Sequence, residues 1–219
     1  MSAGCVPERR RGHLIAFEGG EGCGKSTQAA RLATELGAIL TREPGGTDAG
    51  RRIRSIVLDA DLAGLDVRAE ALLLLADRAQ HVAEVVRPAL DRGVDVVTDR
   101  FAGSTLAYQG WGRGLDVGEL ERLSAWAAGG LQPDLVMLLE VDPEVAAERL
   151  HGSPDRMEQA GTEFHRRVGD GYRALAAASP EVWAAVDGSG TVDEVAARVG
   201  AAVDAWLARE RRQARPARQ

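Results

Sequence analysis

Residues 19–26, Gly-Gly-Glu-Gly-Cys-Gly-Lys-Ser, have the composition and spacing of a loop that binds phosphate groups. Glycines let backbone N–H groups turn inward toward phosphate oxygens, and a helix that follows adds the positive end of its dipole. Lys25 is the only lysine in the chain and would reach the β- and γ-phosphates of a nucleotide, while the Ser26 hydroxyl would ligate Mg²⁺. The pattern predicts nucleotide binding by Gly19, Gly20, Glu21, Gly22, Cys23, Gly24, Lys25, Ser26 and Thr27.

A second pair of chemically capable residues, Asp99 and Arg100, follows the apolar run at 94–98. An acid at the carboxyl end of a parallel strand, beside a phosphate loop, is well placed to hold Mg²⁺ or its water ligands. The neighbouring arginine would neutralise a phosphate group. The alternative interpretation is a strand-end acid next to a solvated arginine.

The elements that must position these residues alternate between strands and helices. Short apolar runs predict strands at 13–17, 38–41, 94–98, 135–141 and 182–186. Helical spacing predicts helices at 26–36, 49–58, 70–90, 117–128, 144–150, 163–178 and 191–209. Alternating strands and helices form right-handed βαβ units, so the fold class is α/β with a parallel sheet covered by helices on both faces.

Composition excludes several classes of protein. The net charge of −6 provides no basic field for nucleic acid, and the longest apolar run is too short to span a membrane. The two cysteines, Cys5 and Cys23, form neither a disulfide framework nor a zinc site. Residues 1–12 lack the apolar stretch of a signal peptide and are expected to be a flexible extension, which makes the cytoplasm the expected location. The arginine-rich residues 209–219 are expected to be a solvated tail, with a phosphate-binding arm as the alternative.

Four segments resemble the thymidylate kinases, and the resemblance runs over nearly the whole chain. They are residues 17–22, 41–47 (Thr-Arg-Glu-Pro-Gly-Gly-Thr), 76–81 (Ala-Asp-Arg-Ala-Gln-His) and 99–110, and residues 155–158 resemble the stretch that flanks the family's lid. The resemblance implies a three-layer P-loop kinase fold with about five parallel strands, a kinase domain at 13–208 and a short lid at about 149–160. It further implies transfer of the ATP γ-phosphoryl group to dTMP, with Mg²⁺ as cofactor and a homodimer as the assembly.

The resemblance also implies roles for individual side chains. Glu21 would lie near the sugar 3′-hydroxyl and the metal, and Tyr108 would pack against the sugar. Arg78 and Arg100 would contact the acceptor phosphate, and Arg78 would also contact the thymine. The implied dTMP-binding residues are Glu21, Arg42, Leu74, Arg78, Arg100, Ser104, Thr105 and Tyr108. The implied catalytic residues are Lys25, Asp99, Arg100, Arg149 and Arg156, with Ser26 and Asp99 at the metal.

Each of these roles has a structural alternative. Arg42 and Arg78 could be salt-bridge partners, Tyr108 a core aromatic residue, Glu21 a solvated loop acid, and Arg149 a surface residue of its helix. The chain departs from the family pattern at Leu74, where many members carry an aromatic ring that stacks on thymine. It departs again in the lid, where only His151 lies as a basic residue between the two flanking arginines.

Three other functions remain open from the sequence alone. Leu74 is compatible with another nucleoside or nucleoside monophosphate kinase on the same fold. A regulatory P-loop ATPase or GTPase is the second alternative, although a chain with one lysine cannot also hold the guanine-specificity motif. A nucleotide-binding module that has lost catalysis is the third, against which the intact Lys25, Ser26, Asp99 and Arg100 argue.

Overall fold

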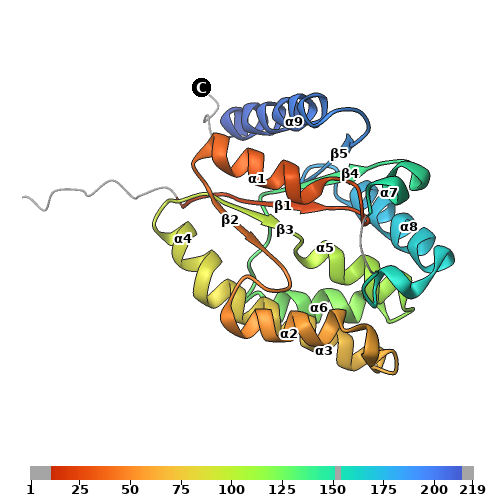
Figure 1. The fold of residues 1–219 in the computed structure, drawn as a ribbon. Coiled ribbons are helices and arrows are strands. Elements are labelled where there is room, and N and C mark those ends of the chain that lie inside the picture. Colours follow the sequence, from red (N-terminus) through yellow and green to blue (C-terminus); the bar gives the residue numbers. More distant parts are fainter. Residues whose placement is uncertain (1–10, 151–153, 214–219) are drawn as a thin grey trace, which may run out of the picture.

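A computed structural model describes residues 11–150 and 154–213, which form a five-stranded parallel sheet between two layers of helices (Figure 1). The strand order is β2-β3-β1-β4-β5. The strands are β1 (Leu14–Glu18), β2 (Ile39–Arg42), β3 (Val96–Asp99), β4 (Leu135–Glu140) and β5 (Trp183–Asp187). The predictions of an α/β class and of a parallel sheet are confirmed, and each predicted strand overlaps an observed one.

The pairing register brings the predicted chemical residues to one edge of the sheet. Asp99 at the end of β3 lies opposite Phe17 of β1 and Arg42 of β2. The phosphate loop follows β1 directly, so it meets the end of β3 at the carboxyl edge. Ligands of open parallel sheets bind at this edge, where adjacent connections leave on opposite faces.

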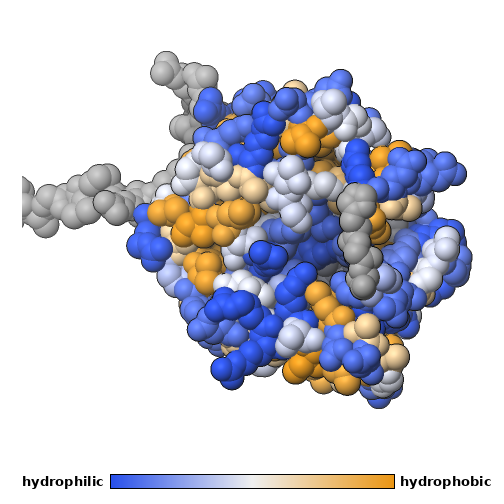
Figure 2. Space-filling model, in the orientation of Figure 1, coloured by the Kyte–Doolittle hydropathy of each residue, from blue (hydrophilic) through white to orange (hydrophobic). Residues whose placement is uncertain are grey.

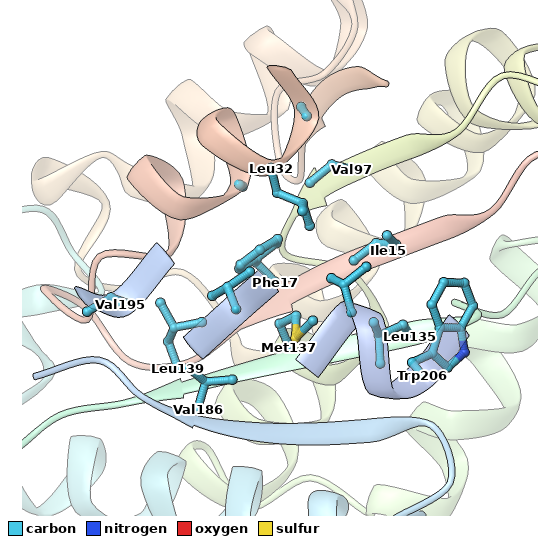
Figure 3. Packing of buried hydrophobic residues seen from close by; sticks show 14 of the residues in the cluster. Ile15, Phe17, Leu32, Val97, Leu135, Met137, Leu139, Val186, Val195 and Trp206 are labelled. Atoms are coloured by element: carbon cyan, nitrogen blue, oxygen red, sulfur yellow. The ribbon is translucent and has the colours of Figure 1, made fainter. Parts of the chain in front are cut away.

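Two hydrophobic cores hold the sheet between its helices. Ile15 and Phe17 of β1 point to the face covered by α1 (Lys25–Leu36) and α9 (Val192–Gln213), where Val199 and Trp206 close the core (Figure 3). Leu14 and Ala16, which alternate with them, pack on the other face. Burial on both faces explains why β1 reads as a continuous apolar run.

The remaining helices lie on the second face and around the carboxyl edge (Figure 1). They are α2 (Asp48–Leu58), α3 (Val67–His81), α4 (Arg87–Asp91), α5 (Ala102–Thr105), α6 (Val117–Ala127), α7 (Pro143–Arg149) and α8 (Thr162–Ala178), with short 3₁₀ turns at Ala60–Leu62 and Glu158–Ala160. In the described part of the chain, no helix combines the length and apolar character needed to cross a membrane.

The predicted single helix at 70–90 is wrong in its start and its continuity. It begins at Val67, because the Asp66 side chain accepts hydrogen bonds from the next N–H groups and caps the helix. A π-helical turn, η2 (Val82–Val86), then separates α3 from α4. Pro88 lies at the start of α4 and has no N–H to donate to the preceding turn, which accounts for the interruption.

Two further segments differ from the prediction. The segment after Asp99 is helical, as α5 followed by the π-helical turn η3 (Leu106–Gly112), although no helix was predicted there. The final helix continues to Gln213, so part of the predicted tail is helical. Residues 1–10, 151–153 and 214–219 lie outside the described residues, and so do the expectations for the N-terminal extension, Cys5, His151 and the end of the basic tail.

Candidate active site

The phosphate loop joins β1 to α1 and lines a cavity of about 380 Å³. Gly22 has a φ of 71°, and a Cβ there would lie 2.3 Å from the Ala146 carbonyl oxygen, so this position accepts only glycine. Lys25 is 6% exposed and donates a hydrogen bond of 2.9 Å to the Gly20 carbonyl. The cavity is lined by the predicted residues Glu21, Gly22, Cys23, Gly24, Lys25, Ser26 and Thr27.

Ser26 and Asp99 meet at the mouth of this loop, as the sequence predicted. The Ser26 hydroxyl donates a hydrogen bond of 2.5 Å to Oδ2 of Asp99. Oδ1 of Asp99 is buried and has no hydrogen-bond partner among the described residues. A hydroxyl beside a carboxylate with a free oxygen fits Mg²⁺, which uses few protein ligands and completes its shell with phosphate oxygens and water. The described residues contain no cluster of three or more His, Cys, Asp or Glu side chains arranged for a metal.

A second cavity adjoins the first, and Glu21 lines both. Arg100 lies at its inner end with φ at 73°, the only non-glycine residue at positive φ among those described. Its guanidinium donates to Glu21 at 2.5 Å and to the Tyr108 and Tyr172 hydroxyls at 3.2 and 3.1 Å. A strained backbone held in place by its surroundings is typical of functional positions. The structure therefore fixes a positive charge between the two cavities.

The charges of this cluster set its protonation states. Burial alone would raise the pKa of Glu21, but Arg100 and then Lys25 outweigh burial and lower the pKa to about 2. Burial lowers the pKa of Arg100, but the Glu21 carboxylate reverses the effect and raises the pKa well above its ordinary value. Glu21 is thus an ionised partner of Arg100 and not a solvated loop acid. In Figure 2, hydrophilic residues surround a hollow near the middle of the face of the molecule that is drawn.

The second cavity, lined by Glu21, Arg100 and Tyr108 among others, is called the acceptor cavity below because the sequence predicts acceptor binding by these residues. Another arginine in its wall, Arg54, was not predicted from the sequence. It lies on α2 and donates to the Pro44 carbonyl at 3.2 Å. Burial lowers the pKa of Arg54, and the positive charges of Arg42 and Arg100 lower it further. Crowded arginines gain most from an anion between them. The predicted Arg42 is exposed and is absent from the cavity wall, although it contributes to the same positive field.

The far end of the cavity combines apolar and amide groups. Leu74 lines it, and so do Arg78 and Thr105, as predicted. Arg78 is 2% exposed and donates to Glu43 at 2.8 Å and to Thr105 at 3.0 Å, so it is a buried salt-bridge partner as well as a cavity residue. Gln109, which was not predicted, also lines the wall, and its Oε1 is buried without a hydrogen-bond partner among the described residues.

A buried carboxylate, Glu18, was also missed. Its oxygens accept hydrogen bonds from the N–H groups of Phe101 and Ser104, the Ser104 hydroxyl and the Tyr172 hydroxyl. Burial raises its pKa, and the hydrogen bond from Ser104 opposes the shift. Glu18 therefore holds the start of α5 directly after Arg100. The signal in the sequence was an acid at the end of an otherwise apolar strand.

The two arginines predicted to flank the lid, Arg149 and Arg156, make different contacts. Arg149 lines the cavity of the phosphate loop, and its guanidinium donates hydrogen bonds to the carbonyls of Gly188 and Gly190. Arg156 is buried, donates to the Val57 carbonyl at 2.9 Å and pairs with Glu70 at 2.6 Å. A backbone carbonyl and a buried carboxylate thus hold the Arg156 side chain, and its hydrogen bonds and ion pairs among the described residues do not include the phosphate loop.

Comparisons with known proteins agree with this arrangement. The family model described as Thymidylate kinase matches residues 17–199. A thymidylate kinase of Leifsonia xyli subsp. xyli is 51% identical over 91% of this chain and 98% of its own length, and that of Solidesulfovibrio magneticus is 49% identical over 89% and 100%. The crystal structure of thymidylate kinase from Ehrlichia chaffeensis superimposes with a TM-score of 0.75 at 29% identity, covering 89% of this chain and 99% of that one. The family match over residues 17–199 and relatives of this identity confirm the predicted P-loop kinase fold and show that the chain is a nucleoside monophosphate kinase that belongs to the thymidylate kinase family.

Proposed function

We propose that the chain transfers the γ-phosphoryl group of ATP to dTMP, giving ADP and dTDP for dTTP biosynthesis. The observation that carries the proposal is the pair of cavities that meet at Glu21, one built on the phosphate loop and the other on paired arginines. A triphosphate in the first cavity and a monophosphate in the second would bring donor and acceptor phosphates together. Such positioning supplies much of the catalysis in phosphoryl transfer.

The residues divide the work by charge. Lys25 and the loop N–H groups bind the donor phosphates, while Arg100 and Arg54 bind the acceptor phosphate. A monophosphate is largely ionised at neutral pH, so its oxygen attacks the γ-phosphorus without a dedicated strong base. Arg100, fixed between the cavities, stabilises the charge that develops during transfer. Ser26 and Asp99 would hold Mg²⁺, which would supply positive charge beside the donor phosphates.

The base would lie at the far end of the acceptor cavity. There, the buried Oε1 of Gln109 accepts the N3–H group of thymine, Arg78 and Thr105 border the polar edge, and Leu74 covers the ring. Leucine supplies apolar contact in place of aromatic stacking. Tyr108 lies between base and phosphate, where its ring packs on the sugar.

We infer that residues 149–160 act as the lid. We also infer that the protein works in the cytoplasm, where ATP and nucleoside monophosphates are found. The active form is proposed to be a homodimer. Leu72 on α3 is 60% exposed and Trp126 on α6 is 81% exposed, although both are large and apolar, and the two helices pack together. A second copy covering these side chains would remove them from water. Light scattering should give a dimer for wild type and a monomer for Leu72→Glu; a monomeric wild type would refute the assembly.

The test of the reaction is coupled ADP release with ATP and Mg²⁺, with dTMP, dUMP, dCMP, dGMP and AMP as acceptors and a sample without acceptor as control. Turnover should be strongest with dTMP and weaker with dUMP. Preference for another acceptor would support phosphoryl transfer but would show that the base assigned to the acceptor cavity is wrong. ADP release that is indifferent to every acceptor would refute the proposed reaction.

A further inference from the structure

Glu70, at the start of α3, is a fully buried carboxylate that contacts Gln109 in the wall of the acceptor cavity. It is 0% exposed and lies one helical turn before Leu74, which lines the cavity. Its Oε1 accepts a hydrogen bond of 2.8 Å from Nε2 of Gln109. Burying a carboxylate costs free energy unless its oxygens are paired, so the partners of Glu70 are the groups to consider.

Two arginines neutralise this carboxylate. Nη1 of Arg156 forms an ion pair with Oε2 at 2.6 Å, and Arg113 donates to each oxygen at 3.3 Å. All of these partner atoms, and Nε2 of Gln109, are N–H groups, so both Glu70 oxygens act as hydrogen-bond acceptors.

This chemistry fixes which way the Gln109 amide faces. If the amide were rotated by 180°, its oxygen would lie against the Glu70 oxygen, and two acceptors would be in contact without a proton between them. The amide must therefore turn its NH₂ group to Glu70 and its oxygen elsewhere. That oxygen is the buried, unpartnered Oε1 at the cavity wall.

We propose that Glu70 is a positioning residue that sets base selectivity by locking the Gln109 amide with its oxygen toward the acceptor. The inference rests on the proposed function, because it needs a pyrimidine monophosphate in this cavity. Thymine and uracil present an N3–H donor to the amide oxygen, whereas cytosine presents a lone pair at N3. A lone pair facing the locked oxygen leaves both acceptors unsatisfied, so dCMP is rejected.

The same carboxylate also attaches the end of the lid segment to the base pocket. Arg156 reaches Glu70 from a segment in which its neighbours, Asp155 and Met157, line the acceptor cavity. Arg113 links Glu70 to the Met157 sulfur, with 3.7 Å between nitrogen and sulfur. Glu70 thus contacts both the Gln109 amide and Arg156, whose neighbours form part of the cavity wall.

The experiment measures kcat/KM for dTMP and dCMP in competition, in wild type, Glu70→Gln and Glu70→Asp. Glu70→Gln offers the Gln109 amide a partner that can donate or accept, so the amide can turn toward cytosine. The dCMP:dTMP ratio should rise about tenfold or more. Glu70→Asp retains the charge for both arginines and withdraws the carboxylate from Gln109, and it should raise the ratio by about threefold or more. Competition in one sample makes the ratio independent of the fraction of active protein.

Glu163→Gln is the matched control, because Glu163 also pairs with two arginines, Arg166 and Arg167, but on the exposed surface of α8. Its ratio should equal that of wild type. A fall in activity with both acceptors by the same factor in a folded Glu70 variant would show a merely structural role and overturn the inference. If Glu70→Gln fails to fold, the dCMP:dTMP ratio of Glu70→Asp tests the inference in its place. Lack of dTMP turnover in wild type would instead refute the proposed function.

Discussion

Replacing Arg100 with alanine removes the positive charge that lies between the two cavities. The guanidinium donates to the Gly19 carbonyl, Glu21, Ser104, Tyr108 and Tyr172, so it is held in place before any substrate binds. A preorganised charge costs little reorganisation when the acceptor phosphate arrives and when charge develops in the transition state. After the change to alanine, Arg54 would be the one arginine left among the described residues of the cavity wall to bind that phosphate, because Arg78 borders the base.

The magnitude follows from the hydrogen bonds that the guanidinium can make. Two charge-assisted hydrogen bonds to a phosphate contribute about 1.5–3 kcal/mol each, or roughly 3–6 kcal/mol together. At about 1.4 kcal/mol for each tenfold change, kcat/KM for dTMP should fall by about 10²–10⁴. ATP binds on the other side, through Lys25 and the loop N–H groups, so its Kd should change by less than about fivefold.

The assay is coupled ADP release at saturating ATP with dTMP varied, together with calorimetric titration of ATP. Arg173→Ala is a suitable control, because this arginine is exposed on α8 and pairs with Asp170. The control should retain kcat/KM within about twofold of wild type. A kcat/KM for Arg100→Ala within tenfold of wild type would refute the assigned role, and a loss of ATP affinity as large as the loss of turnover would place Arg100 at the donor instead.

Three further substitutions test other parts of the site. Burial, with the charge of Glu43, raises the pKa of Asp77 from 3.8 to about 6, so the folded state binds more protons than the unfolded chain between these values. Stability relative to Asp77→Asn should therefore fall as pH rises through this window, by about 2 kcal/mol between pH 4.5 and 7.5 in urea unfolding. Glu18→Gln leaves donors of the Arg100-bearing segment unpaired, and should lower the free energy of unfolding by about 1–3 kcal/mol and lower kcat, measured by denaturation and turnover. Ser26→Ala removes one of the two proposed Mg²⁺ ligands, and should raise the Mg²⁺ concentration for half-maximal activity by roughly tenfold in a magnesium titration.

The contrary results are equally specific. A pH-independent difference between wild type and Asp77→Asn would show that the carboxyl titrates normally in the folded state. Full turnover in a folded Glu18→Gln would show that Arg100 is oriented without Glu18. An unchanged magnesium titration in Ser26→Ala would remove that hydroxyl from the metal site.

Local rules explain what could be predicted. The phosphate loop, the five strands and the family segments were predicted because glycine spacing, apolar runs and strand-to-helix order are properties of short stretches of chain. Leu74, Arg78, Thr105 and Tyr108 were predicted through the resemblance, and the structure places each of them at the acceptor cavity. The capped start at Asp66 and the π-helical turn before Pro88 were missed, since they depend on side-chain and backbone hydrogen bonds.

Sequence patterns thus establish the fold class and the phosphate loop, whereas packing between elements selects which charged side chains line the cavities. The chain carries many arginines, and spacing alone does not distinguish Arg54, which turns into the cavity, from Arg42, which faces solvent. Nor does it show that Arg156 pairs with Glu70, which is distant in sequence. The physical reason is that the position of a long charged side chain depends on burial and on a carboxylate partner, and both arise only when separate elements pack together.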